Sequence, residues 1–116
     1  MDLVVGTETY RLIATPRGGQ WTAHAVRAAS GDRFGTDFSG PTEADVVARL
    51  TAWLEWQREH ADALAALQSA EQAFHRTIAG SAFANASGAV ELQRDSLDQV
   101  EAARVRLDEV RARQPV

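Results

Sequence analysis

The sequence contains no cysteine and no lysine, and only three of its 116 residues are proline. Without cysteine, the chain has no disulfide bond, no thiolate nucleophile and no cysteine-ligated zinc. No apolar run approaches the ~20 residues that cross a bilayer, and the first residues lack the basic-then-apolar order of a secretory signal. We therefore expect a cytoplasmic protein with no membrane partner, whose length corresponds to one domain.

A basic surface is also missing, because sixteen acidic residues outnumber twelve arginines and give a formal net charge of −4. Residues 1–41 carry four arginines and four acids, residues 42–80 three and six, and residues 81–116 five and six. Nucleic-acid binding requires a basic footprint, which none of these segments has. A local group of arginines lies near a predicted helix C-terminus, where cations are stabilised in any case, at Arg104, Arg106, Arg111 and Arg113. We therefore expect no nucleic-acid partner.

The first forty residues have the pattern of an antiparallel sheet. Four short segments are rich in β-branched and aromatic residues: 3–5, 10–15, 21–29 and 34–38. Between the second and the third, Pro16–Gly19 combines a proline with two glycines that accept the positive φ of a tight turn. In the third segment Trp21, Ala23 and Ala25 share one face, but neither face is purely polar, so its buried side stays open. The pattern predicts a meander of three or four strands.

A helical pattern starts after Gly40–Pro41. Thr42 is the expected N-cap, and Glu43 and Asp45 place negative charge at the positive end of the helix dipole. No proline or glycine then occurs before Gly80, which predicts a continuous helix of about 38 residues and ~57 Å. A compact chain of this size has a diameter of roughly 35 Å, so such a helix would project from a globular body.

A second helix is predicted over residues 90–113. The connecting segment Gly80–Gly88 consists of small and polar residues, which favours an antiparallel helical hairpin. The apolar face of the second helix consists of Leu97, Val100, Ala103, Leu107 and Val110. The sequence thus predicts an α+β fold, a small antiparallel meander followed by a long helix and a helical hairpin. We divide this continuous structural unit into residues 1–57, the sheet with the start of the long helix, and residues 58–116, the hairpin.

Apolar residues recur along the long helix at alternating steps of four and three, which is the spacing of a coiled-coil seam. Around Trp53 the stripe widens to about half of the helix circumference, more than one small sheet covers. Because the second helix has few large apolar residues, we expect self-association into a dimer or a higher homo-oligomer. The expected interface comprises Val46, Leu50, Trp53, Leu54, Trp56, Gln57, His60, Leu64, Leu67, Phe74 and Ile78.

Residues suited to catalysis or metal binding are sparse. His60 and His75 lie about 22 Å apart on a straight helix, and Glu71 with His75 supplies only two ligands. The chain has no Gly-x-Ser-x-Gly motif, and the glycines before Gln20 lack a phosphate-binding lysine. We expect no catalytic residue, no cofactor and no metal. Gln57, His60 and Glu71 interrupt the seam, where they either fix the register of the partners or face solvent.

Residues 10–57 resemble a known module. They contain a strand, a glycine-bearing turn, a strand beginning Trp21-Thr22-Ala23, a third strand with glycine, and Gly40-Pro41-Thr42-Glu43-Ala44 before an amphipathic helix. This order resembles the β-β-β-α module of HicB-like antitoxins. The resemblance implies a small toxin ribonuclease as partner, and in that family a separate DNA-binding segment often follows. Residues 58–116 resemble no family and carry no helix-turn-helix signal.

These observations favour a non-enzymatic interaction or scaffold protein that self-associates through its long helices and engages another protein. A HicB-like antitoxin or regulator that binds a small toxin is the alternative hypothesis. A third hypothesis is a small enzyme whose site forms only between subunits.

Overall fold

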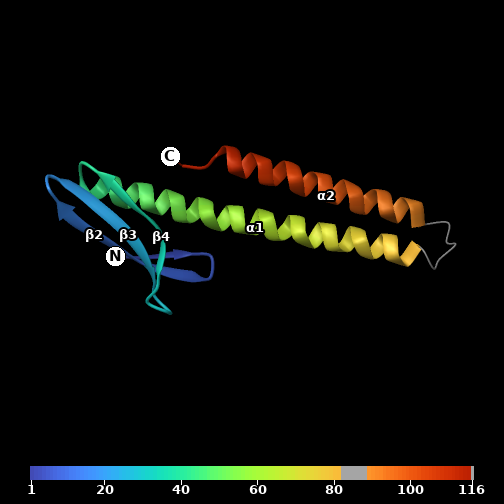
Figure 1. Ribbon diagram of the computed structural model, residues 1–116, viewed down its shortest axis with the longest axis horizontal. Helices are drawn as coiled ribbons and strands as arrows, with labels where there is room; N and C mark the ends of the chain where they lie inside the picture. Colours follow the sequence, from blue (N-terminus) through green and yellow to red (C-terminus); the bar gives the residue numbers. More distant parts are fainter. Residues whose placement is uncertain (82–88, 116) are drawn as a thin grey trace. The chain divides into compact units, whose positions relative to one another are not determined.

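The computed structural model describes residues 1–81 and 89–115 and has an α+β fold (Figure 1). A four-stranded antiparallel sheet precedes two helices, which confirms the predicted fold class. The elements are β1 (Asp2–Val5), β2 (Glu8–Arg17), β3 (Gln20–Arg27), β4 (Arg33–Gly40), α1 (Glu43–Ser81) and α2 (Ala89–Ala112). Within the described ranges, no helix combines the length and the apolarity that a membrane span needs.

The sheet is a meander in which each strand pairs with the next, in the order β1-β2-β3-β4. The turn between β2 and β3 is shorter than the sequence predicts, because Pro16 still pairs with Trp21 inside the ladder. Only Gly18 and Gly19 form the turn, with φ of 57° and 82°. Two consecutive positive φ values match the right-handed twist of the flanking strands and favour glycine strongly.

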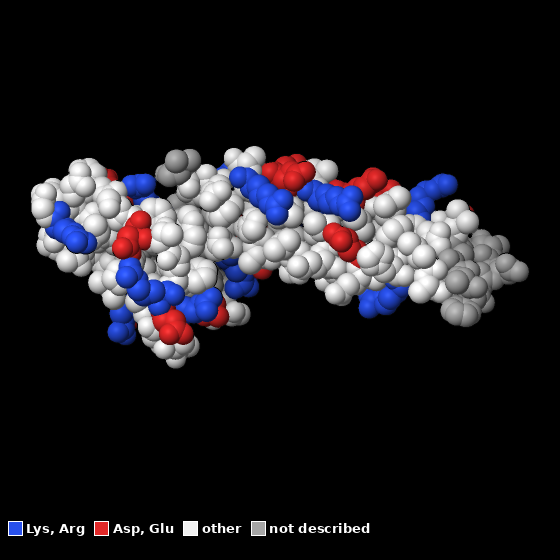
Figure 2. Space-filling model, in the orientation of Figure 1, with Lys and Arg blue, Asp and Glu red and all other residues white. Residues whose placement is uncertain are grey.

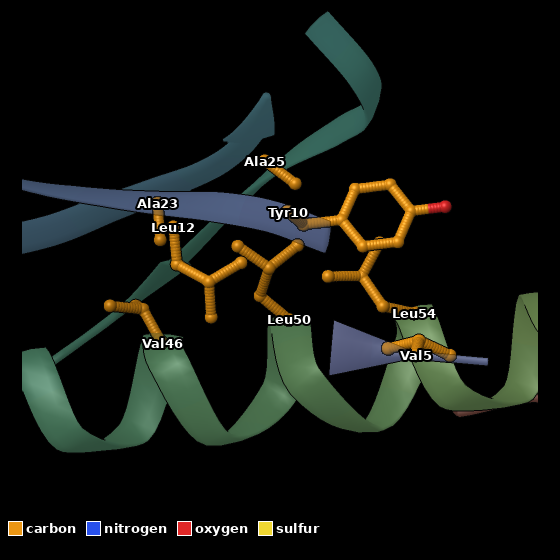
Figure 3. Packing of buried hydrophobic residues seen from close by; sticks show 8 residues of the cluster. All are labelled: Val5, Tyr10, Leu12, Ala23, Ala25, Val46, Leu50 and Leu54. Carbon is orange, nitrogen blue, oxygen red and sulfur yellow. The ribbon is translucent and has the colours of Figure 1, made fainter. Parts of the chain in front are cut away.

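The described chain divides into two compact units, residues 1–58 with 115–116 and residues 59–114. In the first unit, the start of α1 covers one face of the sheet (Figure 1). Ala23 and Ala25 of β3 are fully buried on this face, which decides the question that the sequence left open. Figure 3 shows the core that they share with α1 and the neighbouring strands: Val5, Tyr10, Leu12, Ala23, Ala25, Val46, Leu50 and Leu54.

Helix α1 begins and continues as its sequence predicts. The Oγ1 atom of Thr42 accepts a hydrogen bond from the backbone N–H of Asp45 at 3.1 Å, which confirms Thr42 as the N-cap. The helix then runs 39 residues without a break, from Glu43 to Ser81. Most of the predicted connection at residues 80–88 lies outside the described residues.

The second unit is an antiparallel helical hairpin. Arg113, just after α2, forms an ion pair of 2.9 Å with Glu59, where the α1 part of this unit begins. A contact between the start of one helix segment and the end of the other requires antiparallel helices. The buried residues of this unit are Ala63, Val100, Leu107 and Val110. Leu97, which the sequence assigned to the same apolar face of α2, is instead 40% exposed.

The first unit depends on Leu50, whose side chain is 0% exposed. We expect Leu50→Ala to lower the free energy of unfolding by about 2–5 kcal/mol, because the deletion leaves a cavity under the sheet. Leu92→Ala is the matched control, since it removes the same atoms from a side chain that is 58% exposed. The control should change stability by no more than about 0.5 kcal/mol. Urea denaturation followed by circular dichroism measures both values, and equal losses would contradict the assigned core.

Candidate interaction surfaces

Three of the eleven predicted interface residues belong to the core of the first unit. Val46, Leu50 and Leu54 are fully buried against the sheet of their own chain, so they have no surface left for a second copy. This corrects the extent of the predicted interface. The heptad spacing reports that one side of the helix is buried, and it does not distinguish a sheet of the same chain from another helix.

Trp53, a fourth predicted interface residue, packs against the edge strand β4. Its ring centroid lies 5.8 Å from that of Phe34 and 6.1 Å from that of Phe38. Phe34 also stacks on Tyr10 at 5.3 Å. Offset and tilted arrangements at these separations stabilise aromatic pairs beyond the area that they bury. The indole is therefore held mainly within its own unit.

The backbone of β4 opens a place for this indole. Ala25 pairs with Phe34 and Ala23 with Phe38, so β4 holds two more residues than β3 between these pairs, which is a bulge. Gly35 lies in the bulge with φ of 83°, and a Cβ built on it would lie 2.6 Å from Cζ3 of Trp53. A glycine between two phenylalanines is the signal in the sequence that could have indicated this contact.

Two arginines border the aromatic cluster. The guanidinium carbon of Arg27 lies 4.6 Å above the Phe34 ring, and that of Arg49 lies 5.6 Å from the centre of the Phe38 ring. Arg49 also donates a hydrogen bond from Nη1 to the backbone carbonyl of Ser39. These cation–π contacts place both charges over rings of the same chain. The cluster therefore acts first as a clamp between β4 and α1.

The other seven predicted interface residues keep part of their surface. Trp56 and Gln57 are half-buried in the first unit. Five lie in the second unit, where His60, Leu64, Leu67 and Phe74 are half-buried and Ile78 is 46% exposed. Glu71, which falls in the same series, is also half-buried. We call the following set the α1 stripe: His60, Leu64, Leu67, Glu71, Phe74 and Ile78.

The α1 stripe flanks the contact between α1 and α2. Ala63 is fully buried in the second unit, and therefore marks the side of α1 that α2 covers. At about 100° per residue, Leu67 and Phe74 lie only about 20–40° from Ala63 around the helix. Leu64 lies about 100° from Ala63, and the other stripe residues lie between these limits. The stripe thus begins at the hairpin contact and extends onto the open side of α1.

The histidines do not assemble a metal site in the part of the chain that the structure describes. Over residues 1–81 and 89–115, no three His, Asp or Glu side chains come together as a ligand set. The ring of His75 lies 6.2 Å from that of Phe74, its neighbour in sequence. His24 is half-buried on the sheet, opposite Ile13 of β2.

Charged side chains of both signs are mixed on the face shown in Figure 2, where arginines and acidic residues lie next to one another. Arg113 pairs with Glu59, and its Nε also donates to the carbonyl of Glu109 at 3.4 Å. Arg33 pairs with Asp37 along β4. The C-terminal arginines thus include one that serves the hairpin itself.

The uncovered face of the sheet is a surface that sequence reasoning did not single out. Val4 of β1 is strongly exposed and Ile13 of β2 is partly exposed. The alternation of β2 places Ile13 opposite to its buried neighbours Tyr10 and Leu12. That alternation is visible in the sequence once the buried face of the sheet is known.

The contact between Gly35 and Trp53 makes a paired prediction. Gly35→Ala adds a methyl group against the indole and forces a positive φ on alanine, whereas Gly31→Ala, at φ 76° with no atom within 4 Å, has only the second effect. We expect Gly31→Ala to cost about 1–2 kcal/mol of unfolding free energy. Gly35→Ala should cost about 1–3 kcal/mol more and change the Trp53 fluorescence. Equal losses in thermal and urea denaturation would show that the indole does not rest on this backbone.

Comparison of the chain with protein-family models, with curated proteins and with solved structures found no match. The α1 stripe, the clamp at Trp53 and the open sheet face are therefore the features on which a functional argument rests.

Proposed function

We propose that this protein is a non-enzymatic interaction protein that self-associates through its long helices, with the α1 stripe as the interface. The observation that carries the proposal is the partial exposure of large apolar residues along one side of a helix. Ile78 is 46% exposed, and Leu64 and Leu67 keep part of their surface. Contiguous apolar surface of this kind marks sites where other chains bind.

The composition of the hairpin supports a need for a partner. Only four of its residues are fully buried hydrophobics, and one of these is alanine, Ala63. Burial of a large aliphatic side chain contributes about 1.5–3 kcal/mol, whereas ordering each backbone residue costs about 1–2 kcal/mol. Val100, Leu107 and Val110 therefore supply little of what two long helix segments require. Burial of the α1 stripe against a second copy supplies more apolar contact.

Self-association leaves the first unit available for another protein, in agreement with a scaffold role. Its α1 residues are occupied by the sheet, so the open face of that sheet, with Val4 and Ile13, is the apolar surface that it offers. In this arrangement the hairpin joins copies of the chain, and each copy presents one sheet.

The alternative proposal is a HicB-like antitoxin or regulator that binds a small toxin. The order of sheet and helix over residues 10–57 supports it, because the strands form one antiparallel sheet with α1 on a single face. The two proposals differ in the partner. Co-purification with a small basic ribonuclease, lost on Ile13→Arg, favours the antitoxin, whereas homo-oligomers without such a partner favour the scaffold.

The proposed self-association predicts a particle heavier than the 12.6 kDa chain in sedimentation equilibrium at micromolar concentration. Leu64→Glu should weaken the association at least about tenfold, because it places a charge without a partner in an apolar contact. Ala65→Glu introduces the same side chain at the adjacent, exposed position and should leave the association constant unchanged.

Circular dichroism of both variants verifies that the helices are retained. A wild-type mass of 12.6 kDa throughout the micromolar range would contradict the proposal. Equal effects of Leu64→Glu and Ala65→Glu would instead place the interface on another surface.

A further inference from the structure

We propose that two copies pair their α1 stripes antiparallel in one register, with His60 of each copy opposite Glu71 of the other and Leu64 opposite Leu67. This inference rests on the proposed self-association and adds the orientation, the register and the role of the polar stripe residues. It assigns a partner-selecting function to His60 and Glu71, which interrupt an otherwise apolar series.

The spacing of the stripe carries the first step. His60, Leu64, Leu67 and Glu71 follow one another at steps of four, three and four residues. This series reads the same in both directions along the helix. When two identical helices lie antiparallel, a twofold axis between Leu64 and Leu67 therefore places every member of the series opposite another member. Seam positions of antiparallel coiled coils face one another in this manner.

The chemistry of the paired residues carries the second step. In this register the leucines meet leucines, and each imidazole meets a carboxylate that accepts its N–H. The contact occurs twice, because the twofold axis repeats it. Polar residues within a seam are satisfied by such pairing, whereas a polar residue opposite an apolar one loses hydration without compensation.

The neighbouring registers lack this match. A shift of the sum of paired residue numbers by seven in one direction places Glu71 opposite Leu67, and a shift in the other direction places His60 opposite Leu64. A parallel pair in register places the Glu71 carboxylates of the two copies opposite each other, where like charges repel. Complementary charge thus selects one arrangement, and a single polar pair in a seam is a known way to specify register.

The burial of these residues agrees with a role at an interface between copies. His60, Leu64, Leu67 and Glu71 are each half-buried, so each retains surface that a second helix can cover. His60 and Glu71 of the same chain are separated by eleven residues, about 16 Å along the helix. They cannot contact each other within one copy, and any energetic coupling between them reports a contact between copies.

A charge exchange tests the register through that coupling. His60→Glu places two carboxylates opposite each other at both contacts, and Glu71→His places two imidazoles there. Each single variant should raise the dimer dissociation constant at least about tenfold in sedimentation equilibrium. The double variant His60→Glu/Glu71→His has the same composition as the wild type and restores opposite groups at both contacts. It should return the dissociation constant to within about threefold of the wild-type value.

Cysteine cross-linking tests the orientation independently, and it is clean because the chain has no cysteine of its own. His60→Cys and Glu71→Cys are prepared separately, mixed and oxidised. In the proposed register, equal positions of the two copies lie about 16 Å apart, well beyond disulfide reach. We expect a disulfide-linked dimer on a denaturing gel from the mixture and none from either variant alone.

The outcomes separate the register from the proposed function. Self-association of the wild type without rescue by the double variant, or with cross-linking of His60→Cys to itself, overturns the register and leaves self-association in place. A wild-type chain that sediments at 12.6 kDa overturns both. Rescue together with cross-linking only in the mixture supports the antiparallel pairing of His60 with Glu71.

Discussion

The packing of α1 on the alanine-lined face of the sheet is the interaction on which the rest of the first unit depends. Ala23 and Ala25 extend only a methyl group from the middle of the sheet, so Leu50 of α1 fits closely over the strands. This contact fixes the rotation of α1 about its axis. It thereby determines which helical residues meet the sheet, which reach the edge strand β4, and which stay on the surface.

The close approach also explains the irregularity of β4. Trp53 lies beside the residues that contact the sheet, and its indole is too large for a regular edge strand at that distance. The bulge at Gly35 removes a side chain where the ring lies, while Phe34 and Phe38 contact the ring from either side. The same bulge interrupts the exposed edge of the sheet, which limits pairing with strands of other chains.

One periodic pattern serves two kinds of contact along α1. In the first unit the four-and-three spacing is buried by a sheet, and in the second unit the same spacing lies beside the contact with α2. The residues that face α2 most directly include Ala63, so the hairpin helices approach closely and leave the larger side chains of the stripe at its border. A helix that is apolar on more than one side in this way has more surface to bury than its own chain covers.

Much of the fold follows from local sequence. The four strands, the N-cap at Thr42 and the unbroken helix to Ser81 depend on turn residues, capping and periodicity, which act over a few neighbouring positions. The position of Pro16 inside β2 was not predicted, because pairing of the last strand residues with Trp21 outweighed the turn preference of proline. Exposure of Leu97 was missed for a related reason, since the rotation of α2 depends on its packing and not on its composition.

The candidate interface was predictable only in part. The sequence by itself determined which residues of α1 are apolar and how they are spaced, because helical periodicity is a local property. Only the tertiary structure decided how they are used: Val46, Leu50 and Leu54 are buried by the sheet, Trp53 is held at Gly35, and the α1 stripe keeps part of its surface. The physical reason is that burial depends on which distant segment arrives at a helix face, and the spacing of residues along one helix carries no information about that segment.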